Sequence, residues 1–125
     1  MIHHVSLGSN DLARARAFYD VVMPILGLRL LKADERNAHY GVGEIIFSLA
    51  RPLNGRPASA GNGTHIAFPV RTRAMVDTFH AEGLKAGGIS DGAPGLRPEY
   101  DANYYGAFLR DPDGNKIEAV TLAAK

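Results

Sequence analysis

The sequence predicts an α+β domain built from two βαβββ modules, whose curved mixed sheets face each other around a cleft. One observation is a repeat that relates the two halves at a spacing of 61 residues. The other is that each half combines one stretch of helical periodicity with several short stretches of strand character. The repeat pairs His4-Val5-Ser6-Leu7 with His65-Ile66-Ala67-Phe68, Phe18 with Phe79, Gly27 with Gly88, and Leu28 with Ile89. We therefore expect one structural unit to occur twice in a single domain, 1–125.

The first module is expected over about residues 1–53. A strand runs from Ile2 to Leu7, and Asn10 or Asp11 is placed to cap a following helix. The apolar positions of that helix recur every three or four residues, at Leu12, Ala15, Tyr19, Val22 and Leu26. Pro24 and Gly27 are predicted to end it. Three short strands then follow, at 28–33, 38–42 and 45–50.

The second module is expected over about residues 63–125, after a loop rich in Gly, Pro, Ala and Asn. The predicted elements are a strand at 64–70, a helix at about 73–86, a short strand near Ile89, a loop at 92–103, and strands at 105–110 and 115–122. A four-stranded sheet with a helix on one side leaves its other face open. Two such sheets are therefore expected to face each other, either within one chain or across a dimer.

Composition excludes several classes of protein. The 125 residues carry a formal charge of +1 with scattered basic residues, which argues against a nucleic-acid partner. No apolar run approaches the roughly 20 residues of a membrane span, and no signal peptide is evident, so we expect a cytoplasmic protein. The chain has no cysteine, so a metal site must use His, Asp and Glu, which favours Zn, Ni, Mn, Co or Fe.

Three residues form a candidate metal site. Side chains alternate across a strand, so His4 and His65 are expected to point away from the apolar residues beside them and into the cleft. Glu118 alternates in the same way with apolar neighbours on the last strand. Two His and one carboxylate leave coordination positions open for a substrate. His3 is the competing ligand, but strand parity and the repeat both favour His4, because His3 corresponds to Thr64.

The loop before the last two strands concentrates aromatic residues. It contains Arg97, Tyr100, Tyr104 and Tyr105. One interpretation is a lid whose hydroxyls and guanidinium orient an anionic or carbonyl substrate. The other is a dimer interface or a packed surface loop, both of which use tyrosine frequently.

These segments resemble the vicinal oxygen chelate superfamily, which includes glyoxalase I, bleomycin-resistance proteins and extradiol dioxygenases. The motifs that carry the resemblance are His4-Val5-Ser6-Leu7 through Asp11-Leu12 to Phe18-Tyr19, then Gly63-Thr64-His65-Ile66-Ala67-Phe68, and finally Gly106-Ala107-Phe108 with the segment from Asp111 to Glu118. The resemblance implies the paired βαβββ fold, with metal ligands at His4, His65 and Glu118. A fourth ligand position falls at Ser48, where glyoxalase I carries a glutamate.

Serine at position 48 shapes the functional expectation. A serine is a weak metal ligand and a poor base, so Glu118 is left as the only ligand able to accept a proton in catalysis. This disfavours glyoxalase I activity and makes the ligand set similar to that of extradiol dioxygenases. We expect a homodimeric, metal-dependent lyase, isomerase or dioxygenase that acts on a small oxygen-chelating substrate, with Ser48 lining the cleft. The alternative is a metal-free, drug-sequestering binding protein of the same fold.

Overall fold

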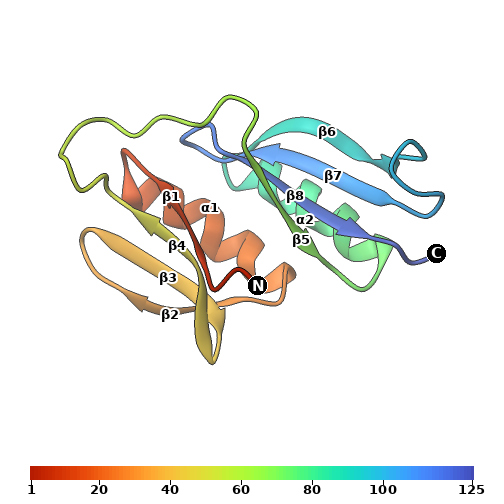
Figure 1. The fold of residues 1–125 in the computed structure, drawn as a ribbon, viewed down its shortest axis with the longest axis horizontal. Coiled ribbons are helices and arrows are strands. Elements are labelled where there is room, and N and C mark those ends of the chain that lie inside the picture. Colours follow the sequence, from red (N-terminus) through yellow and green to blue (C-terminus); the bar gives the residue numbers. More distant parts are fainter.

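The computed structural model describes residues 1–125 and contains two βαβββ modules in succession (Figure 1). Module one comprises β1 (Val5–Gly8), α1 (Leu12–Ile25), β2 (Arg29–Ala33), β3 (Asn37–Val42) and β4 (Glu44–Ala50). Module two comprises β5 (His65–Pro69), α2 (Arg73–Lys85), β6 (Ile89–Leu96), β7 (Tyr105–Arg110) and β8 (Lys116–Thr121). The predicted α+β class with two βαβββ modules is confirmed. Neither helix is both long enough and apolar enough to cross a membrane.

The two sheets have the same topology. Sheet one has the strand order β1-β4-β3-β2 and sheet two the order β5-β8-β7-β6. In each sheet the first and last strands of the module pair in parallel, and the other pairs are antiparallel. Ser6 lies opposite Ser48, and Ala67 lies opposite Glu118. Ser48 and Glu118 therefore occupy equivalent positions in the two sheets, as the family resemblance implies.

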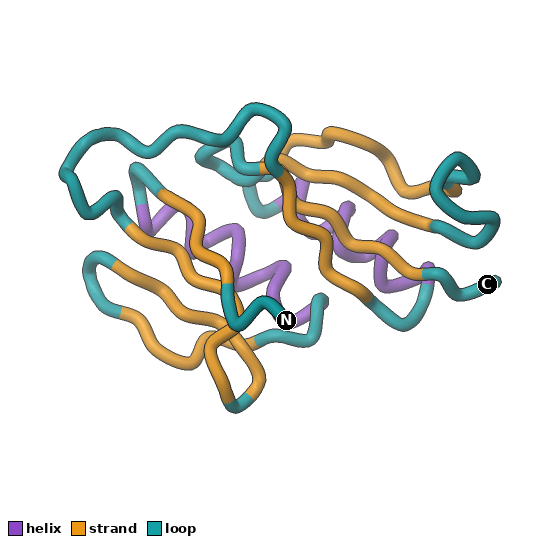
Figure 2. The backbone as a smooth tube through the Cα atoms, in the orientation of Figure 1, coloured by secondary structure: helices purple, strands orange, loops and turns teal.

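The modules lie side by side, with both helices on the same side of the sheets (Figures 1 and 2). The two helices contact each other, and the rings of Phe47 and Phe68 meet across the module boundary with centroids 5.7 Å apart. One continuous cluster of 19 buried apolar residues spans both modules. Within one chain the open faces of the sheets consequently do not cover each other. Of the two arrangements that the sequence leaves open, pairing of the faces within a chain is not observed.

Local signals account for the helix boundaries. Asp11 caps α1 by accepting a hydrogen bond from the Arg14 amide at 3.1 Å, and Thr72 caps α2 by accepting one from the Met75 amide at 3.2 Å. Pro24 lies in the last turn of α1, and Gly27, with φ of +87°, follows that helix in a conformation that favours glycine. The expected boundaries of α1 and α2 are therefore correct to within one residue.

Two strand boundaries differ from the expectation. The first strand begins at Val5, so His3 and His4 precede it. The second strand of module two, β6, extends to Leu96, whereas the sequence predicts a loop from Gly92. The segment contains Gly92, Pro94 and Gly95, which are typical of turns, but it pairs with β7 through two shifts in register. Irregular pairing of this kind leaves no alternating pattern in the sequence.

A buried carboxylate joins the two modules. Asp111, which is 2% exposed in the turn between β7 and β8, accepts a 2.6 Å hydrogen bond from the Tyr19 hydroxyl on α1. It also accepts hydrogen bonds from the Asn115 amide and side chain. Burial and the neighbouring Asp111 raise the pKa of Tyr19. Because every oxygen of this carboxylate has a donor, the charge is tolerated inside the protein.

Replacing Asp111 should destabilise the fold strongly. The Asp111→Ala variant leaves the buried Tyr19 hydroxyl without its acceptor, so we expect the free energy of unfolding to fall by about 3 kcal/mol. Asp113→Ala, in the same turn, removes only the acceptor of an exposed hydrogen bond from the Asn10 amide and should cost less than about 1 kcal/mol. Urea unfolding of both variants measures the difference, and equal losses would contradict the assignment.

Candidate functional site

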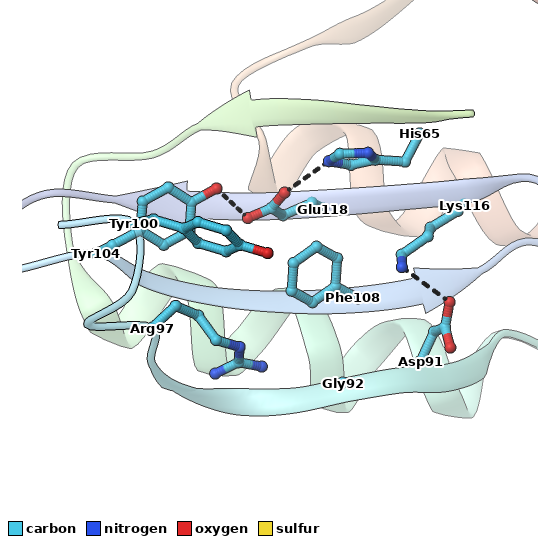
Figure 3. A pocket seen from close by; sticks show the side chains of 9 residues that line it. All are labelled: His65, Asp91, Gly92, Arg97, Tyr100, Tyr104, Phe108, Lys116 and Glu118. Atoms are coloured by element: carbon cyan, nitrogen blue, oxygen red, sulfur yellow. Dashed lines mark hydrogen bonds and ion pairs between the residues drawn. The ribbon is translucent and has the colours of Figure 1, made fainter. Parts of the chain in front are cut away.

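The open face of sheet two carries a pocket of about 620 Å³ (Figure 3). Strands β5 to β8 and the segment between β6 and β7 supply its walls. The lining residues are His65, Asp91, Gly92, Arg97, Tyr100, Tyr104, Phe108, Lys116 and Glu118. Polar and charged groups surround a central aromatic ring, so the pocket suits a small polar ligand.

His65 and Glu118 form a pair at one side of the pocket. The Nε2 atom of His65 lies 3.1 Å from Oε1 of Glu118, and Figure 3 shows the two side chains pointing toward each other from neighbouring strands. Glu118 is 1% exposed, whereas the His65 side chain is 43% exposed. The carboxylate is thus held inside the sheet while the imidazole borders the pocket.

Tyr104 holds the other carboxylate oxygen. Its hydroxyl donates a 2.5 Å hydrogen bond to Oε2 of Glu118. Burial and this hydrogen bond raise the pKa of Tyr104. Gly106 leaves the necessary space, since a Cβ atom there would lie 2.9 Å from Oε2 and 3.3 Å from the Tyr104 ring. The orientation of Glu118 is therefore fixed by partners on both of its oxygens.

Two cations flank the ring of Phe108. The Arg97 guanidinium lies 5.5 Å and the Lys116 ammonium 4.9 Å from the ring centroid. Lys116 also pairs with Asp91 at 3.4 Å, whereas Arg97 donates to the Ala93 carbonyl and has no carboxylate partner. Arg97 thus contributes an uncompensated positive charge, which favours an anionic group in the pocket.

The His65–Glu118 pair has the donor chemistry and spacing of two metal ligands. Two atoms that are each about 2.1 Å from one ion lie about 3.0 to 3.4 Å apart, which matches the observed 3.1 Å. No group of three His, Asp or Glu side chains lies close enough within the chain to hold a metal. His4 is exposed in module one, where its ring contacts His3. One chain thus brings together two members of the predicted set.

The structure separates the other predicted site residues. Arg97, Tyr100 and Tyr104 line the pocket with His65 and Glu118. Tyr105 does not, because it lies on the opposite face of β7, where its hydroxyl donates to Asp77 of α2. That hydrogen bond raises the pKa of Tyr105. Ser48 lies in sheet one, where its hydroxyl is 2.7 Å from Nδ1 of His39.

Sequence analysis missed four residues of the pocket: Asp91, Gly92, Phe108 and Lys116. Strand alternation could have identified two of them, since Lys116 shares a face with Glu118, and Phe108 lies opposite Glu118 across the β7–β8 pair. The same alternation separates Tyr104 from Tyr105. Asp91 and Gly92 gave no such signal, because their strand pairs irregularly.

Comparison with known proteins identifies the family of this chain. The model of the Glyoxalase/Bleomycin resistance protein/Dioxygenase superfamily matches residues 1–119. The chain belongs to this superfamily. The curated metallothiol transferase FosB of Shouchella clausii is 28% identical over 121 residues, which are 96% of this chain and 79% of that protein. The resemblance expected from the sequence is therefore confirmed.

Solved structures of the superfamily share the fold. A glyoxalase/bleomycin resistance protein from Albidiferax ferrireducens is 38% identical and superimposes with a TM-score of 0.84, over 94% of this chain and 95% of that one. Lactoylglutathione lyase from Agrobacterium tumefaciens is 24% identical, with a TM-score of 0.66 over 97% of this chain and 92% of that one. The second likeness concerns the fold alone.

The hydroxyl of Tyr104 should ionise only in strongly alkaline solution. The absorbance of ionised tyrosine is followed against pH for the wild type and for Tyr104→Phe, and the difference between the two curves reports on the Tyr104 hydroxyl alone. We expect the midpoint of this difference curve to lie well above the ordinary tyrosine pKa of about 10. Since the folded-state pKa is raised, the hydrogen bond stabilises the fold below about pH 10 and is lost as the pH rises through the folded-state pKa. A midpoint at or below 10 would contradict the bond to Glu118.

Proposed function

We propose that this chain is a metal-dependent enzyme that acts on a small, anionic, oxygen-bearing substrate. The observation that carries the proposal is the His65–Glu118 pair, which has the spacing of two metal ligands and lies beside an unpaired arginine. Burial of Glu118 and its bond to Tyr104 orient the carboxylate before any ligand arrives. Such preorganisation is typical of binding and catalytic sites.

The third ligand in this proposal is His4 of the partner subunit in a homodimer. Both open faces lie on the same side of the chain, so a second copy can cover them. One face carries His65 and Glu118, and His4 adjoins the other. A twofold dimer that lays sheet one of each chain on sheet two of the other would form two identical sites, each with one His4, one His65 and one Glu118.

The chain's own residues define what the pocket can bind. Arg97 and Lys116 supply positive charge on either side of Phe108, so an anionic group would lie between them over the ring. A bound divalent ion, which we expect to be Zn, Ni, Mn, Co or Fe, would supply Lewis acidity toward the substrate oxygens. Tyr104 occupies Oε2 of Glu118 and leaves Oε1 on the side of His65.

The class of reaction follows from Ser48. This residue occupies the place in sheet one that Glu118 occupies in sheet two, so sheet one offers no carboxylate equivalent to Glu118. That asymmetry disfavours an isomerisation that moves protons between neighbouring carbons with two carboxylates. It favours dioxygenase chemistry or a thiol transfer, the latter being the activity named for the FosB relative.

A metal-free binding protein is the second candidate function. It is favoured by one observation, which is that both oxygens of Glu118 already have partners within the protein. The carboxylate is therefore satisfied without a metal. In that case Arg97, Lys116 and the tyrosines would enclose an anionic ligand without converting it.

Metal content tests the ligand assignment. Protein without a polyhistidine tag, purified without chelators, should contain about one divalent ion per chain. His65→Ala and Glu118→Gln should each lower the occupancy about tenfold or more. His80→Ala is the control, because His80 lies on α2 and contacts Ser90 away from the pocket. Stoichiometric metal in both pocket variants would contradict the assignment.

Metal removal separates the two candidate functions. We expect turnover of at least one substrate in a screen of methylglyoxal–thiol adducts, catechols, and thiols with electrophilic co-substrates. EDTA should abolish that turnover and re-added metal should restore it. Ligand binding that is unaffected by EDTA, with no turnover under any metal, would instead establish the binding protein.

A further inference from the structure

A second polar pocket lies at one end of module one, and its residues all precede those of the first pocket in the chain. Its volume is about 370 Å³, and no residue lines both pockets. The end of β1, the turn between β2 and β3, and the start of the segment that crosses to module two form its walls (Figure 1). The lining residues are Ser9, Asn10, Arg36, Arg51, Pro52, Gly55, Arg56 and Pro57. Three are arginines, and none is acidic.

The three guanidinium groups have no carboxylate partner. Every ion pair of the chain involves other residues, and no side-chain hydrogen bond occupies Arg36, Arg51 or Arg56. The carboxylates nearest in sequence are Glu35, which forms no ion pair, and Asp34, which accepts hydrogen bonds from the backbone amides of Arg36 and Asn37. The pocket therefore concentrates positive charge in a chain whose formal net charge is only +1.

The backbone that presents these arginines is constrained. The Arg51 amide donates to the Arg36 carbonyl at 2.9 Å, which keeps the two residues adjacent. Arg51 and Arg56 each precede a proline, and this restricts their backbone to extended conformations. The Asn10 side chain clamps the far end of the segment through the Ala58 amide, at 2.6 Å, and the Ala58 carbonyl, at 3.0 Å.

We propose that Arg36, Arg51 and Arg56 form a second binding site, for a small, multiply charged oxyanion of the phosphate type. Guanidinium groups match the oxygens of such anions with paired hydrogen bonds. A concave wall of one charge also raises the local concentration of counter-ions. A singly charged carboxylate would neutralise only part of this charge, so the site selects for higher charge. The proposal stands independently of the function proposed for module two.

Phosphate titration followed by NMR tests the site directly. With inorganic phosphate as the probe in buffer of low ionic strength, the backbone amides of Ser9, Asn10 and Gly55 should shift and saturate. Acetate at the same concentrations should produce no saturable shift at these amides. The titration is repeated in an Arg97→Ala background, so that binding in the first pocket is separated from binding here.

Two double variants with the same change in charge provide the comparison. Arg36→Gln/Arg51→Gln should weaken phosphate binding about tenfold or more. Arg29→Gln/Arg71→Gln, which alters two exposed arginines outside the pocket, should change it less than about twofold. Thermal unfolding verifies that both variants fold. The proposal would be overturned by equal weakening in both variants, by shifts that do not saturate, or by loss of all binding in Arg97→Ala.

Discussion

The burial of the Glu118 carboxylate is the constraint on which the candidate site depends. A side chain that is 1% exposed cannot carry a charge in a sheet unless both oxygens have partners. His65 and Tyr104 supply them, one from the parallel strand β5 and one from the end of the segment before β7. The same constraint explains why a glycine occupies position 106, because the Cβ atom of any other residue would lie too close to Oε2 of Glu118. The Glu118 carboxylate consequently connects strand β5 to the 97–104 segment, and both of these form walls of the pocket.

The two modules show how one scaffold supports different chemistry at equivalent positions. In sheet two, Phe108 and Glu118 lie opposite each other, and in sheet one His39 and Ser48 do. The apolar faces behind them are similar, because both contribute to a single core and contact each other through α1 and α2. The open faces carry different residues. Module two forms the pocket, and in our proposal module one of the partner subunit covers that pocket and supplies His4.

Much of the fold could be predicted from the sequence, because repeated patterns report on regular elements. The spacing of 61 residues identified both modules, and alternation placed His65 and Glu118 on one face. A short strand near Ile89 could be predicted, but its extension through Gly92 to Leu96 could not, since register shifts remove the alternation that marks a strand. The sequence places Tyr105 at the end of a loop, where side chains do not alternate between two faces as they do in a strand. The assignment of Tyr105 to the site was therefore not constrained by strand alternation. The arginine pocket was not foreseen either, because its residues come from three separate connections that meet only in the folded chain.

In our proposal two chains complete each metal site, and the metal content of mixed dimers is the sharpest test of this arrangement. Two variants of the chain are co-expressed. One carries His4→Ala and the other carries both His65→Ala and Glu118→Gln, each with a different tag that lacks histidine, and dimers that bear both tags are isolated. In such a dimer one site retains all three ligands and the other loses all three. We expect about one metal ion per mixed dimer and almost none in either mutant homodimer. Mixed dimers without metal, or a chain that forms no dimer, would contradict it.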